Sequence, residues 1–200
     1  MELYTWLQTL SSSAPAPGGG GASALVGAVA SSLGSMVANL TSGKKKYAAY
    51  QADIERILVQ TMELTDRLHG LIAADAEAFV PLAAAYGIPK DDPTRAERLE
   101  TALRTAAVPP MEMLVTLDEL VPILEELAQK GSRLAISDVG CAAAFCASAA
   151  KGALLNLFVN TKLMNDRAFA ELQNQKAATL EADIASRCAA VYENVKENMV

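Results

Sequence analysis

Asp75 is the residue whose type and position most clearly suggest chemistry. It belongs to a series of residues whose spacing alternates between three and four, which is the heptad pattern of a helix with one apolar seam. The series is Ile54, Ile57, Thr61, Leu64, Leu68, Leu71, Asp75, Ala78 and Leu82. An apolar residue would pack better at position 75. Two interpretations stay open: a buried polar residue that fixes helix register, or a carboxylate of raised pKa that is ready for proton transfer.

Four consecutive glycines, Gly18–Gly21, form the second unusual feature, within APAPGGGGASAL at residues 14–25. Glycine loses more backbone entropy on ordering than any other residue, so we predict a loop over residues 11–21. A long helix of small residues is predicted to follow directly. The run raises the question of what approaches this backbone so closely that no side chain is tolerated.

Three lysines in GKKKY, residues 43–47, stand at the predicted start of a helix. Positive charges there oppose the helix dipole, at a cost of about 0.3–1 kcal/mol each. The run is either solvated surface or a place where an anion binds. It is not a phosphate-binding P-loop, because Ala38 and Lys45 occupy the positions of that motif's first glycine and its Ser/Thr.

Three polar residues mark the helix predicted from residue 133. Asp138 and Asn156 are 18 residues apart, which is five turns, so they share a face but lie about 27 Å apart along the axis. They therefore cannot form one catalytic couple. Asn160 follows Asn156 by one turn, and each asparagine is either a helix–helix hydrogen bond or a ligand contact. The single histidine, His69, provides neither a metal site nor a Ser-His-Asp triad.

Composition limits the class of protein. The 200 residues are 52% hydrophobic and carry a net charge of −6, which argues against a nucleic-acid-binding protein. The first residues lack signal-peptide features, and the three cysteines are expected to be small buried residues in a reducing cytosol. Residues 22–42 are uncharged and nearly long enough to span a bilayer. Their Ala, Gly and Ser content favours instead a helix packed tightly inside a soluble, cytoplasmic protein.

The chain as a whole is predicted to be one all-α domain, residues 1–200, built as a bundle of long helices. Asp92 is expected to cap a helix with Pro93 at its first position, and Ser132 is expected to cap another. The uncharged small-residue helix predicts a homodimer. The expected helices cover residues 2–10, 22–40, 45–86, 93–109, 110–129 and 133–159, and a last one runs from 165 or 166 nearly to the C-terminus.

These segments together resemble the formiminotransferase-cyclodeaminase C-terminal domain family. The resemblance rests on PAPGGGGASALVGAVASSLGSMVANLTSGKKKY, ADAEAF, GIPKDDPTRAER, SDVGCAAAF and GALLNLFVN, which occur in the same order. The family includes formimidoyltetrahydrofolate cyclodeaminases and methenyltetrahydrofolate cyclohydrolases. The resemblance therefore implies a folate enzyme that acts at the carbon between N5 and N10, with no metal or other cofactor.

The resemblance also implies roles for individual residues. Asp75 would be the catalytic acid/base, and Gly18, Gly19, Gly20 and Gly21 would bring backbone N–H groups to the folate. Lys44 and Lys45 are candidates for binding the folate carboxylates, and Asp138, Asn156 and Asn160 are further candidate substrate contacts. Which of the two reactions occurs stays open. The alternative is a non-catalytic helical module that dimerises, in which the seam aspartate and the asparagines serve pairing specificity.

Overall fold

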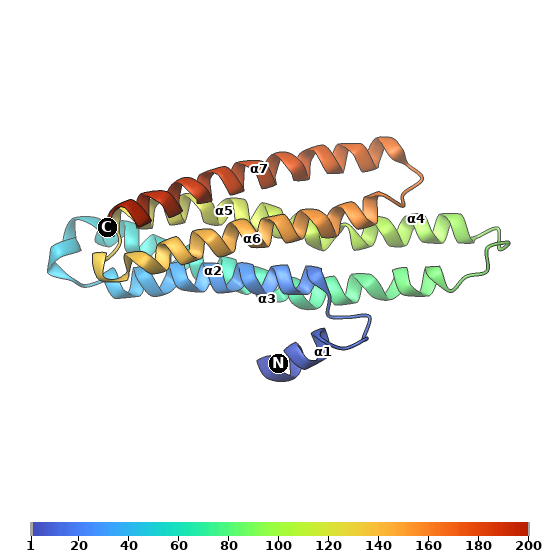
Figure 1. Cartoon of the computed structure of the whole chain (residues 1–200), viewed down its shortest axis with the longest axis horizontal. Helices are drawn as coiled ribbons and strands as arrows, with labels where there is room; N and C mark the ends of the chain where they lie inside the picture. The colour runs from blue at the N-terminus through green and yellow to red at the C-terminus, as the bar shows by residue number, and fades with distance from the viewer. Residues whose placement is uncertain (1, 200) are drawn as a thin grey trace.

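The computed structural model describes residues 2–199, and within them it consists of helices and connecting loops without a strand (Figure 1). The all-α prediction is confirmed for this range. Seven α-helices and two short 3₁₀ segments, η1 and η2, follow one another along the chain. They are α1 (Leu3–Leu10), α2 (Gly19–Thr41), η1 (Lys45–Tyr50), α3 (Gln51–Tyr86), α4 (Arg95–Ala106), α5 (Val108–Lys130), η2 (Arg133–Ala135), α6 (Ile136–Thr161) and α7 (Arg167–Glu197).

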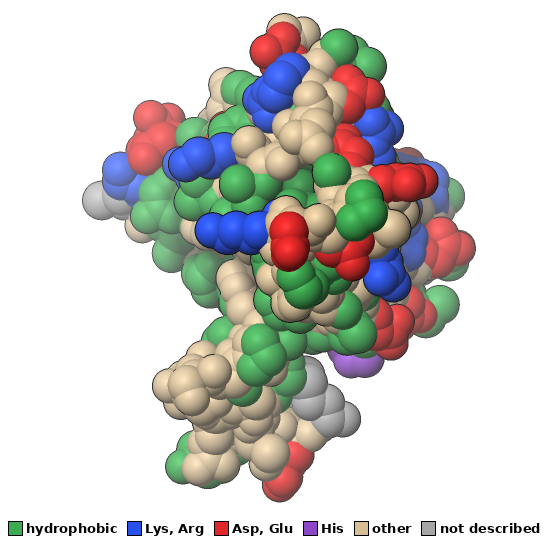
Figure 2. Space-filling view, turned by 90° about the vertical axis from the view of Figure 1, so that its right-hand side faces the viewer, with side chains coloured by type: hydrophobic (Ala, Val, Ile, Leu, Met, Phe, Trp, Pro, Cys, Tyr) green, Lys and Arg blue, Asp and Glu red, His purple; other side chains and the backbone are tan. Residues whose placement is uncertain are grey.

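The long helices run side by side along the length of the molecule (Figure 1). Helix α2 packs against both α3 and α6, and α7 packs against α5 and α6. Helix α4 extends the line of α5, and α1 lies away from the bundle. In the end-on view of Figure 2, α1 forms a separate lobe beneath the bundle, while acidic and basic side chains mix over the bundle above it. Trp6 is the buried residue of α1.

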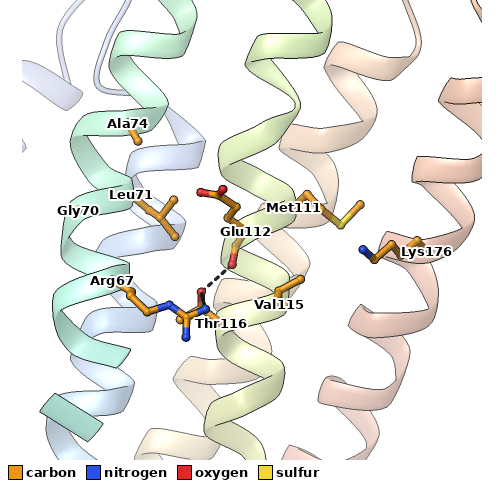
Figure 3. A pocket seen from close by; sticks show the side chains of 9 residues that line it. All are labelled: Arg67, Gly70, Leu71, Ala74, Met111, Glu112, Val115, Thr116 and Lys176. Atoms are coloured by element: carbon orange, nitrogen blue, oxygen red, sulfur yellow. Dashed lines mark hydrogen bonds between the residues drawn. The ribbon is translucent and has the colours of Figure 1, made fainter. Parts of the chain in front are cut away.

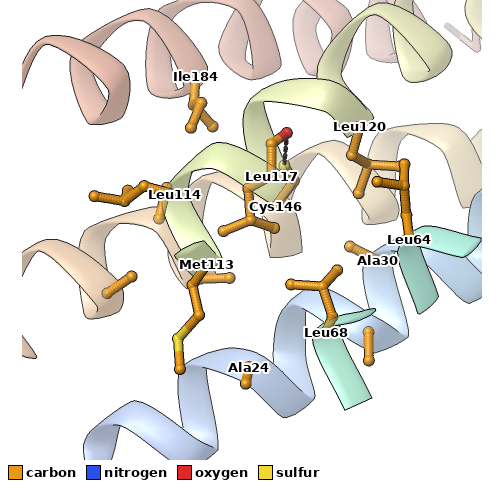
Figure 4. Packing of buried hydrophobic residues seen from close by; sticks show 14 of the residues in the cluster. Ala24, Ala30, Leu64, Leu68, Met113, Leu114, Leu117, Leu120, Cys146 and Ile184 are labelled. Atoms are coloured by element: carbon orange, nitrogen blue, oxygen red, sulfur yellow. Dashed lines mark hydrogen bonds between the residues drawn. The ribbon is translucent and has the colours of Figure 1, made fainter. Parts of the chain in front are cut away.

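Helix α5 carries the centre of the core. Its buried leucines and Met113 meet Leu68 of α3, Ala24 of α2 and Ile184 of α7 in one cluster (Figure 4). The thiol of Cys146 in α6 donates a long hydrogen bond, 3.8 Å, to the Leu117 carbonyl. The predicted heptad seam of α3 is confirmed, because every member from Ile54 to Leu71, and Leu82, is buried, whereas Asp75 and Ala78 are half-buried.

The predicted glycine loop is wrong in its extent. Gly19, Gly20 and Gly21 form the first turn of α2, and only Gly18 lies outside, at the N-cap position. The first turn of a helix lacks intrahelical N–H bonds, so its backbone N–H groups remain available to other partners. Glycine costs entropy in a helix, but it is needed here because another side chain lies too close to this turn to leave room for a Cβ.

Four smaller predictions also need correction. The predicted helix over residues 45–86 begins as the 3₁₀ segment η1 and becomes α-helical only at Gln51. Asp92 does not cap a helix that starts at Pro93; its carboxylate accepts hydrogen bonds from the Thr94 backbone and hydroxyl, and α4 starts at Arg95. The Ser132 side chain caps no helix, because its hydroxyl oxygen accepts from Lys44 Nζ at 3.4 Å. Cys141 is exposed on α6, although Cys146 and Cys188 are buried.

Charge is distributed unevenly over the bundle. Helix α2 carries no charged residue, and α6 carries only Asp138 and Lys151. In the described part of the chain, the ion pairs lie within or between α3, α4, α5, α7 and Asp166 before α7, and none involves α2 or α6. Gly19–Thr41, Lys45–Tyr86 and Arg133–Thr161 are long and apolar enough to cross a membrane by length and composition, yet half of the α2 window is buried inside the bundle.

Candidate active site

A pocket of about 240 Å³ lies where the N-terminus of α2 meets α3, α4 and α6. Helix α2 contributes glycine backbone, α3 contributes a carboxylate and aromatic rings, and α6 contributes two amides. The lining residues are Pro15, Ala16, Gly18, Gly19, Gly20, Asp75, Ala76, Phe79, Leu82, Tyr86, Ala106, Asn156, Val159 and Asn160. The structure thus brings together Asp75, three of the four glycines and both asparagines.

The Asp75 carboxylate contacts the first turn of α2. Its Oδ2 accepts a hydrogen bond from the backbone N–H of Gly21 at 3.0 Å. A side-chain Cβ at Gly20 would overlap both carboxylate oxygens of Asp75. This contact answers the question raised by the glycine run: the group that approaches the backbone is a carboxylate of the protein itself. A Cβ at Gly19 would lie 3.2 Å from Asn156 Nδ2, whereas one at Gly18 would meet nothing within 4 Å.

Burial raises the pKa of the Asp75 carboxyl, and the Gly21 N–H bond opposes that rise without cancelling it. Desolvation disfavours the charged form, while a donor at a helix N-terminus favours it. A carboxyl in this position can hold or release a proton closer to neutral pH than an exposed aspartate can. That property suits general acid–base chemistry.

Asn156 and Asn160 are oriented by hydrogen bonds to the backbone. Asn156 Nδ2 donates to the Gly152 carbonyl at 2.8 Å, and Asn160 Nδ2 donates to the carbonyls of Ala106 and Asn156 at 3.0 Å each. The bond to Ala106 joins α6 to α4, as the helix–helix interpretation expected. Because each amide nitrogen is engaged, the side-chain oxygens are the groups that can accept hydrogen bonds from a ligand in the pocket.

Four of the expected substrate contacts lie outside this pocket. Gly21 is buried, and its N–H is taken by Asp75. Lys44 and Lys45 follow the C-terminus of α2, so the 23-residue helix separates them from the glycines by about 34 Å. Asp138 lies at the start of α6, five turns from Asn156.

Sequence reasoning missed the apolar walls of the pocket. Phe79, Leu82 and Tyr86 follow Asp75 by four, seven and eleven residues, so they lie on the same face of α3. The helical spacing could have indicated them. Ala106 and Pro15 gave no comparable signal, because their place in the wall depends on how α4 and the loop before α2 are positioned.

A second hollow, of about 580 Å³, lies between α3 and α5 and reaches Lys176 of α7 (Figure 3). Of the two cations that line it, Arg67 is already paired, since its guanidinium pairs with Glu119 and donates to Thr116 Oγ1 at 3.1 Å. Neither Asp75 nor any of the glycines at the start of α2 lines this hollow. The chemistry that the sequence indicated is therefore concentrated in the pocket that contains Asp75.

Asp75→Asn is expected to raise the thermal stability of the protein at neutral pH. The folded state holds the Asp75 proton more tightly than the unfolded chain, so wild type loses stability as pH rises through the raised pKa. The asparagine variant has no such loss, and its oxygen can still accept from Gly21. Melting temperatures of both proteins should be measured between pH 4 and 8. The variant is expected to melt at a higher temperature than wild type, by a difference that increases with pH. A constant or shrinking difference would contradict the raised pKa.

Comparisons with known proteins agree on one family. The sequence pattern described as Formiminotransferase-cyclodeaminase matches residues 2–179. A methenyltetrahydrofolate cyclohydrolase of Methylorubrum extorquens is 40% identical, over 98% of this chain and 97% of that protein. A formimidoyltransferase-cyclodeaminase of Rattus norvegicus is 30% identical over 95% of this chain, which spans 36% of the rat protein.

A solved structure extends the agreement to the fold. The crystal structure of a formiminotetrahydrofolate cyclodeaminase from Thermotoga maritima superposes with a TM-score of 0.84 at 29% identity, covering 98% of this chain and 94% of that one. The match covers nearly the full length of both chains, so it includes every helix that lines the pocket. The chain therefore belongs to the formiminotransferase-cyclodeaminase family.

Proposed function

We propose that this chain hydrolyses 5,10-methenyltetrahydrofolate to 10-formyltetrahydrofolate, with Asp75 as the acid/base. The observation that carries the proposal is the half-buried Asp75 carboxyl of raised pKa in the lining of an apolar-walled pocket. The choice of hydrolysis is supported by the 40% identical cyclohydrolase, which matches this chain over nearly the whole length of both proteins.

The reaction needs one group that can manage protons. Water attacks the methenyl carbon and loses a proton to the Asp75 carboxylate, which leaves a tetrahedral carbon between N5 and N10. The bond from that carbon to N5 then breaks, and N5 takes a proton from Asp75. The remaining hydroxyl becomes the formyl oxygen on N10 as its proton passes to solvent. No electron is transferred to or from the folate, so the steps require only acid–base groups.

The rest of the pocket is suited to hold the folate ring. Phe79 and Tyr86 offer apolar and aromatic surface for a flat pterin. The N–H groups of Gly19 and Gly20, in the first turn of α2, can donate to a ring oxygen. The side-chain oxygens of Asn156 and Asn160 can accept from the ring N–H and amino groups. These contacts would fix the one-carbon unit against Asp75.

Cyclodeamination of 5-formimidoyltetrahydrofolate is the second candidate, favoured by the likeness to the Thermotoga maritima structure. In that reaction N10 attacks the carbon of the protonated formimino group and closes the ring, Asp75 passes the N10 proton to the resulting amine, and ammonia then leaves. Both reactions pass through a tetrahedral carbon at the same place. One carboxyl of shifted pKa can serve either.

Purified protein should be given each substrate in turn while the ultraviolet absorption band of methenyltetrahydrofolate is followed. A cyclohydrolase speeds the decay of this band above the uncatalysed rate, and a cyclodeaminase makes it appear from 5-formimidoyltetrahydrofolate. A thermal shift with folinic acid, a stable folate, provides an independent measure of binding. Absence of both reactions and of any shift would leave the non-catalytic dimerisation module as the better interpretation.

The proposal includes a cytoplasmic homodimer that binds neither membranes nor nucleic acid and uses no metal or other cofactor. Support for the dimer comes from α2, where Ala22, Val26, Val29, Leu33, Met36 and Leu40 are spaced four, three, four, three, four. None of the six is buried, and Val29, Met36 and Leu40 are 42%, 39% and 44% exposed. This set, the α2 stripe, has the heptad spacing of a helix that pairs with another helix.

Val29→Asp is expected to convert the protein from a dimer to a monomer, because the substitution places a charge in the centre of the α2 stripe. Light scattering at micromolar concentration should give twice the chain mass of 21.0 kDa for wild type and about that mass for the variant. Leu172→Asp is the matched control, since Leu172 is a 62% exposed leucine on α7. A wild-type particle of one chain mass would refute the dimer.

A further inference from the structure

The pocket within one chain has no cation for the acidic end of a folate. Its lining holds one carboxylate, two amides and apolar groups, but neither lysine nor arginine in the described residues. Its volume of about 240 Å³ is below the roughly 300–1,000 Å³ of sites that enclose a drug-sized ligand. If the ring occupies the pocket, the glutamate end extends beyond it. This step rests on the proposed function.

A cluster of free cations lies at the opposite end of α2. Lys44, Lys45 and Lys46 are all exposed, and none of them forms an ion pair within the described chain. The segment is nevertheless held in place, because Lys44 Nζ donates to Ser132 Oγ and the Tyr47 hydroxyl accepts from the Arg133 N–H at 3.0 Å. A positioned group of three unpaired cations is suited to bind an anion.

The pocket and the lysine cluster come together if the α2 stripe pairs with the same stripe of a second copy of the chain. Its midpoint, between Ala22 and Leu40, is residue 31, and Gly18 and Lys44 each lie 13 positions from that midpoint. A two-fold axis there, perpendicular to α2, makes the two helices antiparallel and places Gly18 of one copy beside Lys44 of the other. A parallel arrangement would instead bring six lysines together.

The largely apolar face around α2 approaches the size that this pairing needs, and Asp66 of α3 lies at its edge beside Met36 and Met62. Helix α2 is about 34 Å long and packs against α3 and α6. Packed helices lie about 8–10 Å apart, so the strip from the axis of α3 to that of α6 covers roughly 540–680 Å² before side-chain relief is counted. A stable interface buries about 800 Å² per partner. Val29, Met36 and Leu40 of α2, Met62 of α3 and Leu155 and Val159 of α6 supply exposed apolar side chains. Val159 also lines the pocket, so the site lies at the edge of this face.

We infer that each folate site is shared between two chains: Asp75 and the glycines come from one, and Lys44 and Lys45 of the partner subunit bind the glutamate carboxylates. In this arrangement the ring and the reacting carbon stay in the pocket of one chain, and the tail crosses to the other. The assignment explains why both lysines are about 34 Å from the glycines within a single chain.

The test is complementation between two defective chains. Lys44→Glu/Lys45→Glu is expected to raise KM at least 10-fold with kcat within about twofold of wild type, because charge-assisted contacts to the tail are lost. Asp75→Asn lacks the acid/base. Mixed and refolded together, the two variants form heterodimers with one complete site. About a quarter of wild-type activity should return when the substrate is below the wild-type KM, since half of the dimers are mixed and each has one intact site of two.

Three results would overturn the inference. Absence of complementation in a solution that contains heterodimers would mean that the lysines act on their own chain or not at all. An equal KM rise for Lys176→Glu, the charge-matched control on α7, would show a general charge effect. A monomer that binds lipid vesicles through the α2 stripe would assign that face to a membrane. In each case an active wild type leaves the proposed hydrolysis standing, whereas an inactive wild type would refute that reaction itself.

The tail contact can be measured separately. Folinic acid and the same compound without its glutamate should be compared for binding to wild type and to Lys44→Glu/Lys45→Glu. Wild type is expected to bind folinic acid at least 10-fold more tightly than the shortened compound, and the variant should bind both about equally. A wild type that does not distinguish the two compounds would show that the lysines do not contact the tail.

Discussion

Asp75→Asn is expected to lower kcat by about 10²–10⁴-fold, the usual contribution of general acid–base catalysis. Asparagine keeps the shape of the side chain and can still accept the Gly21 N–H bond, so the helical circular dichroism, the oligomeric state and the folate affinity should remain close to wild type. It cannot take up or release a proton at neutral pH. The loss should therefore appear in kcat and not in KM.

The control is Glu77→Gln, which changes an exposed acid two residues further along α3 in the same chemical way. It should leave turnover unchanged. If Asp75→Asn retains turnover within about threefold of wild type, Asp75 is a structural residue that fixes the register of α3. Asp138 would then be the next candidate for the acid/base.

Gly20→Ala is expected to reduce kcat/KM by at least about 100-fold without unfolding the protein. Alanine is the better helix former in the first turn of α2, so secondary structure gains slightly. Its Cβ, however, would overlap the Asp75 carboxylate, which must then rotate and lose the Gly21 bond. A displacement of about 1 Å at a reacting group can cost 10²-fold in rate. Gly19→Val should also weaken folate binding, since its Cβ crowds Asn156.

Gly18→Ala is the matched control, because a Cβ at that position would meet nothing within 4 Å and the backbone there is extended. Steady-state kinetics and circular dichroism should be measured for both alanine variants. If Gly20→Ala were as active as Gly18→Ala, the absence of a side chain at position 20 would have no role in catalysis. The contact with Asp75 would then have no functional importance.

The sequence predicted the helices well because their apolar spacing is long and regular. Ile54 to Leu71 lie in the seam as expected, and Asp166 starts α7 by accepting from the Phe169 N–H. Asp75 could be singled out because a charge interrupts an otherwise apolar series. The relation between Asp75 and Gly20 could not be predicted, because 55 residues separate them and only the packing of α2 on α3 brings them together.

Local rules failed where a tertiary contact determined the outcome. Propensity placed the glycines in a loop, but the approach of Asp75 favours glycine inside the first turn of α2. Ser132 looked like a cap, yet its hydroxyl accepts from Lys44, which is 88 positions away. The distance from Lys44 to the pocket follows from the length of α2, but sequence reasoning had not considered it.

Salt should act in opposite directions on the two sides of this bundle. The ion pairs that link α3 to α5, and α5 to α7, are partly exposed, so dissolved ions screen them and weaken each by a few tenths of a kcal/mol. Helices α2 and α6 take part in no such pairs in the described chain, and sulfate strengthens apolar association on their side by its exclusion from the surface. Concentrated ammonium sulfate should thus favour association through α2 while it weakens the ion pairs within each chain.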